Sequence, residues 1–205
     1  MMRLKKKQIV VVVSMITPMV LGFVACSGQS GKRAGQGAAT GAVVGAAGGM
    51  VSALVFGGSV GDAAARGAVW GASTGAVSGA IVGAQEDQTQ KKQRDAAAAK
   101  LKQRLGEDAF NGLAALAECK HEVALGYAKT AAGSDNPDFA LAGLWLEVLT
   151  LADRKQEDKA RALFPTLVSK DNRVASDSQA EEGMRKALQG LMNIRAEYNL
   201  PRTCS

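Results

Sequence analysis

Apolar and polar positions divide the chain into stretches of different character. An apolar stretch over 9–24 follows a basic start, and two later runs, 34–61 and 67–85, contain no charged residue. The segment 86–105 is charged and rich in alanine, and from 106 onward apolar residues recur at helical spacing. No convincing strand-like alternation is present. The pattern therefore predicts an all-α fold.

The region 106–205 has the pattern of a packed helical domain. Apolar residues three or four positions apart define its helix faces: Phe110, Leu113, Ala114 and Ala117; Ala124, Tyr127, Ala128 and Ala131; Leu141, Leu144, Trp145, Val148 and Leu151; Met184, Ala187, Leu188, Leu191 and Tyr198. We expect these faces to point inward. The charged segment 86–105 is expected to be an exposed helical spacer in front of this domain.

Cap and breaker residues predict where the helices of this domain begin and end. Asn136 and Pro137 are expected to open one helix as its cap and first-turn proline. Pro165 is expected to end or kink a shorter helix. Ser178 and Glu181 have the spacing of a capping box at the start of the last helix.

Glycine recurs at every fourth position within both uncharged runs. The positions are Gly37, Gly41, Gly45, Gly49, Gly67, Gly71, Gly75, Gly79 and Gly83. Glycine inside a helix costs roughly 1 kcal/mol relative to alanine, so this spacing requires a compensating contact. Glycines four residues apart form a smooth groove that lets two helix backbones approach closely.

The two glycine runs predict a helical hairpin over 37–85. Each uncharged run is long enough to cross roughly 30 Å of hydrocarbon as a helix. Asp62, between them, is expected to cap the second helix, so both ends of the hairpin lie on the same side. The alternative is a flexible Gly/Ala-rich linker of low complexity.

The first 25 residues have the layout of a secretory signal peptide, with a basic start before the apolar stretch. An uncleaved membrane anchor is the alternative. Phe23-Val24-Ala25-Cys26 resembles the lipobox of bacterial lipoproteins, although Phe23 stands where leucine is usual. The resemblance implies that Cys26 carries acyl chains such as palmitate, which anchor the protein in membrane lipid. The polar residues 26–36 would form a tether, and Ser27 implies sorting to the outer membrane.

The hairpin resembles the glycine-zipper two-helix domain of bacterial envelope lipoproteins, the family that includes the rickettsial surface-antigen lipoproteins. The resemblance covers 31–84 and implies self-association through the glycine faces. Anchoring, oligomerisation and pore formation all fit this pattern.

A weak repeat is present within the C-terminal region. Ala124, Ala128 and Ala131 are matched 36 residues later by Ala160, Phe164 and Leu167. Helix pairs of this length resemble tetratricopeptide repeats, which implies that 106–205 binds a protein partner. Asp171-Asn172 and Pro165 depart from that family's pattern. The alternative is a helical bundle without repeats.

Charge argues against a nucleic-acid partner. Four of the basic residues behind the net charge of +6 lie in the first seven residues, so the rest of the chain is nearly balanced. The basic residues from Lys91 to Arg104 are mixed with Glu86, Asp87 and Asp95, which indicates a solvated helix face.

Candidate catalytic chemistry is sparse. The single histidine, His121, lies two residues from Cys119, and residues two apart on one helix point in different directions. We therefore expect no enzyme, catalytic residue, cofactor or metal site, with zinc binding by Cys119 and His121 as a weaker alternative. Once Cys26 is acylated, Cys119 and Cys204 remain, and we expect them to form a disulfide that contributes about 4 kcal/mol.

These observations favour an envelope lipoprotein that faces the periplasm, with a membrane-associated hairpin, a helical protein-binding domain and a structural or scaffold role. Two alternatives remain. One is a pore-forming oligomer of hairpins, and the other is a periplasmic assembly factor for a secretion or pilus system.

Overall fold

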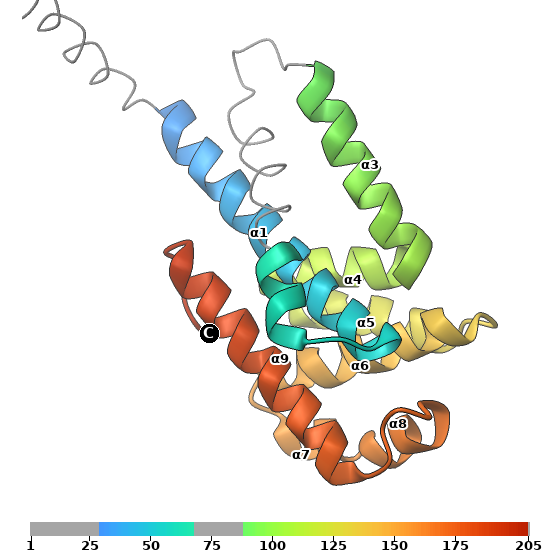
Figure 1. Ribbon diagram of the computed structural model, residues 1–205. Coiled ribbons are helices and arrows are strands. Elements are labelled where there is room, and N and C mark those ends of the chain that lie inside the picture. Colours follow the sequence, from blue (N-terminus) through green and yellow to red (C-terminus); the bar gives the residue numbers. More distant parts are fainter. Residues whose placement is uncertain (1–28, 68–87, 205) are drawn as a thin grey trace, which may run out of the picture.

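The computed structural model describes residues 29–67 and 88–204, and within these ranges every regular element is a helix. The elements are α1 (Gln29–Phe56), a helix at 60–67, α3 (Gln88–Leu105), α4 (Glu107–Ala117), α5 (His121–Ala132), α6 (Pro137–Asp153), α7 (Glu157–Arg161), α8 (Phe164–Lys170) and α9 (Asp177–Glu197) (Figure 1). The predicted all-α class is confirmed.

Helix α6 forms the centre of the molecule because it is apolar on all sides. Between Ala140 and Asp153, every residue except Glu147 is buried. Its neighbours are α1, α3, α4, α5, α7, α8 and α9. The helix opens as the sequence predicts, because the Asn136 side chain accepts hydrogen bonds from the backbone N–H groups of Asp138 and Phe139, with Pro137 in the first turn.

Helices α5 and α6 pack closely because glycine lies at their contact. A Cβ atom on Gly143 would lie 2.2 Å from the backbone nitrogen of Ala132. The small residues Ala124, Ala128 and Ala131 form the buried face of α5. This face was predicted from helical spacing, and so was the inward face of α9 with Met184, Ala187 and Leu191, which is also buried.

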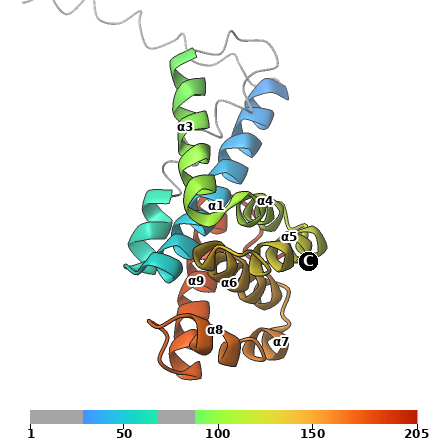
Figure 2. The same ribbon diagram turned by 90° about the vertical axis from the view of Figure 1, so that its right-hand side faces the viewer.

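The glycine-rich helix α1 is part of the same core as the C-terminal helices. Val43, Ala47, Met50, Val51 and Val55 are buried in one apolar cluster that extends through α4, α6 and α9. In Figures 1 and 2, α1 runs into the body of the molecule, while its N-terminal half and α3 project from one end. The hairpin 37–85 and the domain 106–205 were predicted as separate units, whereas α1 and the C-terminal helices share one core.

Three helix boundaries differ from the sequence prediction. The second glycine-rich helix begins at residue 60, not at Asp62, since the Ser59 hydroxyl accepts a 3.3 Å hydrogen bond from the Asp62 backbone N–H. The chain turns before it at Gly57 and Gly58, both with positive φ. The cap of α9 is Ser176, which binds the Gln179 backbone N–H, so the predicted Ser178–Glu181 box is wrong. Pro165 lies in the first turn of α8 rather than ending a helix.

Two other predicted segments differ or lie outside the described residues. The predicted tether 26–36 is helical from Gln29 onward, because α1 extends back to this residue. The part of the predicted spacer 86–105 that the structure describes, 88–105, forms α3, but it is not fully exposed, since Leu105 is completely buried. The signal peptide 1–25 and Cys26 lie outside the described residues.

Candidate functional site

The two glycine-rich helices approach each other to backbone contact. A Cβ atom on Gly49 would lie 2.2 Å from the carbonyl oxygen of Ala63, and one on Gly67 would lie 2.0 Å from the carbonyl oxygen of Gly45. Both distances are far below van der Waals contact, so no larger residue fits without moving a helix. The described parts of the two glycine-rich helices therefore have the close backbone approach that the glycine spacing predicts.

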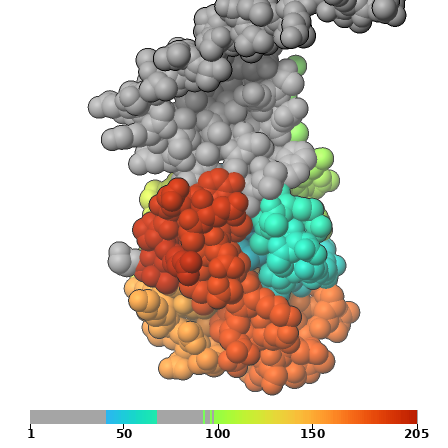
Figure 3. Space-filling model, turned by 60° about the vertical axis from the view of Figure 1, so that its left-hand side comes forward, coloured from blue at the N-terminus to red at the C-terminus, as the bar shows by residue number. Residues whose placement is uncertain are grey.

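Helix α1 also packs against the C-terminal helices. Gly190 and Gly183 of α9 leave room for Met50 and Leu54, which would lie 2.9 Å and 3.1 Å from a Cβ atom at these positions. Figure 3 shows α9 and the segment around the 60–67 helix side by side on one face of the molecule. Helix α1 is thus packed on two sides, by its own hairpin partner and by the C-terminal helices.

The structure places only some of the predicted zipper residues. Gly37, Gly41, Gly45 and Gly49 lie on α1, and Gly67 lies at the end of the described second helix. The remaining predicted positions, Gly71, Gly75, Gly79 and Gly83, lie outside the described residues. Their packing stays a prediction.

The predicted disulfide between Cys119 and Cys204 is present, with a Cα–Cα distance of 5.5 Å. Cys119 has a φ of 59° in the turn after α4, while His121 is the first residue of α5. The two residues are therefore not on one helix, contrary to the expectation from the sequence. His121 lies beside Asp153 and Cys204, and Cys119 is bonded to Cys204.

A buried ionic cluster lies next to this disulfide. Arg195 of α9 donates hydrogen bonds of 2.6 Å and 3.0 Å to the two carboxylate oxygens of Asp153, and a third of 3.1 Å to the carbonyl oxygen of Leu116. His121 Nε2 lies 2.9 Å from Asp153 Oδ2. The Asp153 and Arg195 side chains are 0% and 1% exposed, so water does not screen this pair.

Sequence reasoning missed Asp153 and Arg195. A charged residue at one end of an apolar helix is ordinarily solvated, so the sequence did not indicate that Asp153 is buried. Arg195 could have been found, since it lies four residues after Leu191 and therefore on the inward face of α9. An arginine at an inward position predicts a buried anionic partner.

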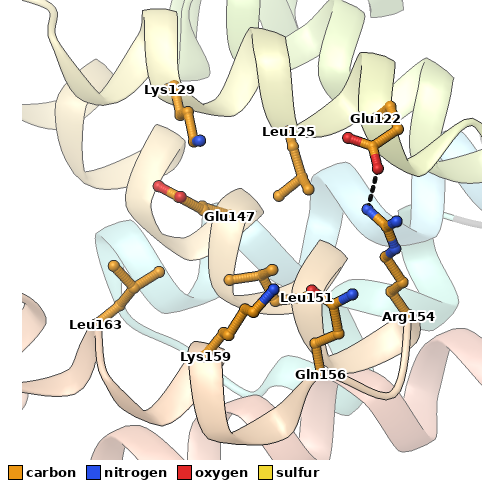
Figure 4. A pocket seen from close by; sticks show the side chains of 9 residues that line it. All are labelled: Glu122, Leu125, Lys129, Glu147, Leu151, Arg154, Gln156, Lys159 and Leu163. Carbon is orange, nitrogen blue, oxygen red and sulfur yellow. Dashed lines mark hydrogen bonds and ion pairs between the residues drawn. The ribbon is translucent and has the colours of Figure 1, made fainter.

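A surface groove of about 400 Å³ lies between α5, α6 and α7 (Figure 4). Apolar side chains and charged groups of both signs line it: Glu122, Leu125, Lys129, Glu147, Leu151, Arg154, Gln156, Lys159 and Leu163. An ion pair between Arg154 and Glu122 closes one end. The mixture of leucines and charges is suited to a polypeptide segment more than to an apolar small molecule.

These features define an all-helical protein with a glycine-packed helix pair built onto an α-helical body. Within the described ranges, no helix has both the length and the apolar character that a membrane crossing requires. Residues 2–87 match the family model of the YMGG-like Gly-zipper, which supports the glycine-zipper part of the prediction. No curated protein and no solved structure matches the chain.

Proposed function

We propose that this chain is a lipid-anchored, membrane-associated protein of the bacterial cell envelope with a structural, non-catalytic role. The observation that carries the proposal is the family match over 2–87, because this range includes both Cys26 and all nine zipper glycines. Similarity to a glycine-zipper family suggests membrane association. The acyl chains on Cys26 would provide the anchor, with the helical body on the periplasmic side of the outer membrane.

The first test is intact-mass analysis and membrane fractionation of the wild type beside Cys26→Ser, with Ser27→Ala as the matched control. We expect the wild type and the control to begin at Cys26, to carry acyl mass and to fractionate with membranes. Cys26→Ser should remain uncleaved or become soluble. Identical behaviour of all three proteins would exclude lipid anchoring at Cys26.

The helical body is proposed to bind a protein partner through the groove between α5, α6 and α7. Support comes from the three leucines, Leu125, Leu151 and Leu163, that line it together with charged side chains. The tetratricopeptide-like organisation would supply such a groove, and the six residues of the weak repeat are all buried. A photo-crosslinking residue at Leu163 should capture a discrete partner in cells, whereas one at the exposed Gln189 of α9 should not.

A pore-forming oligomer is the second candidate, favoured by the extension of the family match across the second glycine run. The burial of Met50, Val51 and Val55 in the protein core weighs against it, because a pore would require α1 to leave that core. Vesicle leakage distinguishes the two. Replacing Gly71, Gly75 and Gly79 by leucine should abolish leakage if pores form, and should alter only oligomer size if the role is structural.

A further inference from the structure

The turn after α4, the end of α6 and the C-terminal segment bring together four side chains that can bind metal. The ligand atoms of His121, Asp153 and Cys204 all lie within 4.8 Å of one another. The sulfur of Cys119 is bonded to that of Cys204, so a second sulfur is at the same place. Nitrogen, oxygen and two sulfur atoms thus converge from three separate parts of the chain.

We propose that reduction of the Cys119–Cys204 disulfide turns this cluster into a zinc site ligated by both thiolates, His121 and Asp153. Zinc prefers four ligands of these types in tetrahedral geometry. The His121 Nε2 and Asp153 Oδ2 atoms are 2.9 Å apart. Two ligand atoms on a tetrahedral zinc ion are about 3.3 Å apart at ordinary bond lengths, so a small movement admits the ion.

The charges around the cluster balance when zinc is bound. The double positive charge of zinc and the guanidinium of Arg195 offset two thiolates and the carboxylate of Asp153. Neutrality matters because the Asp153 side chain is fully buried, where an uncompensated charge is costly. Arg195 also holds the carboxylate through two hydrogen bonds, as groups behind metal ligands commonly do.

The oxidation state of the sulfurs decides whether the site exists. In the disulfide each sulfur is bonded to the other and offers no thiolate. A dithiol reductant breaks this bond by giving two electrons and two protons to Cys119 and Cys204, and is itself oxidised to a disulfide. Zinc binding then releases the two thiol protons to water. The structural disulfide and the zinc site are thus alternative states of one cluster.

Zinc titration of the full chain tests the proposal. The protein is reduced with dithiothreitol, separated from it by gel filtration without oxygen, and titrated with zinc against a chromogenic chelator. We expect one zinc per chain in the reduced wild type and none in the oxidised protein. Reduced His121→Asn should bind at least about tenfold more weakly because one ligand is lost, while reduced Lys120→Ala, at an exposed neighbour, should match the wild type.

The double variant Cys119→Ser, Cys204→Ser separates metal binding from loss of the disulfide. It has neither the bond nor the thiols, and it should bind no zinc at this site. Cobalt added to the reduced wild type should give the thiolate charge-transfer absorption that this variant lacks. Stoichiometric zinc binding by the double variant would overturn the proposal. So would unchanged zinc affinity in reduced His121→Asn, or a reduced wild type that binds no zinc.

Discussion

At the scale of single residues, Asp153 connects parts of the chain that are far apart in sequence. It lies at the end of α6, pairs with Arg195 of α9, and is also in hydrogen-bond contact with His121 at the start of α5. The guanidinium of Arg195 extends the network to α4 through the carbonyl of Leu116. Three helices therefore meet at one carboxylate, and Arg195 connects a fourth to it. Because neither charge of the Asp153–Arg195 pair reaches water, each is compensated mainly by the other.

Replacement of Arg195 by methionine should destabilise the protein by about 3–5 kcal/mol, since it leaves the Asp153 carboxylate buried without its main partner. Adding Asp153→Asn should recover part of this loss, so the double variant is more stable than the sum of the single effects predicts. Urea denaturation measures both values. Arg185→Met, at an exposed position of the same helix, should change stability by less than about 0.5 kcal/mol.

Tyr198 should make the stability of the protein decrease at alkaline pH. Burial, and then the neighbouring Glu197 carboxylate, raise the pKa of Tyr198 above its ordinary value of 10.0. The fold thus favours the protonated phenol, and this contribution is complete below about pH 10 and is lost as pH rises through the raised pKa. The variant Tyr198→Phe has no phenol at this position, so the position cannot ionise. The unfolding free energy should therefore decrease more from pH 8 to pH 11 in the wild type than in the variant. Equal decreases in the two proteins would contradict the assignment.

At the scale of elements, α1 has two packing faces with different requirements. Its glycines allow backbone contact with the 60–67 helix, while its larger apolar residues fill the core beside α4, α6 and α9. The cost of glycine within a helix is thus offset on one side by close approach and on the other by apolar burial. An isolated glycine zipper would have only the first of these contributions.

Gly67→Ala should destabilise the hairpin, whereas Gly61→Ala on the same helix should not. A Cβ atom at Gly67 meets the carbonyl oxygen of Gly45 at 2.0 Å, while one at Gly61 has nothing within 4 Å. We expect a loss of about 1–3 kcal/mol for the first variant and a gain of up to about 1 kcal/mol for the second. Thermal denaturation measures both. Equal effects would show that the two backbones do not touch at Gly67.

Sequence periodicity predicted the helices well wherever one face is apolar and the other polar, as in α5 and α9. It was less reliable at helix ends, because serine and aspartate offer several similar caps close together and only the tertiary turn selects Ser59 and Ser176. Pro165 was ambiguous for a related reason, since proline both ends one helix and begins another. Local pattern identifies an element more readily than its boundary.

At the scale of the whole molecule, the sequence did not reveal how its parts combine. The disulfide was predicted because only two cysteines remain after Cys26, but the convergence of His121 and Asp153 upon it depends on the α4–α5 turn. The docking of α1 onto the C-terminal helices was missed for a similar reason. An apolar run free of charge has the same pattern whether it faces lipid or a protein core.

The shared core predicts that the C-terminal helices do not reach full stability without α1. A chain beginning at Gln88 would expose the surface that Val43, Met50, Val51 and Val55 cover. Burial of each such side chain contributes about 1.5–3 kcal/mol, and the total for the four is comparable to the stability of a typical domain, about 5–15 kcal/mol.

Trp145 fluorescence measures this effect because the side chain is 1% exposed and, like Leu54, lies beside Gly183. The control is the full chain with Trp70→Phe, which leaves Trp145 as its only tryptophan. We expect the shortened chain to show red-shifted emission and a broad unfolding transition, since water reaches the core where α1 was removed. If its emission and its urea midpoint equal those of the control, the C-terminal helices form an independent domain, and the contacts of α1 add nothing to their stability.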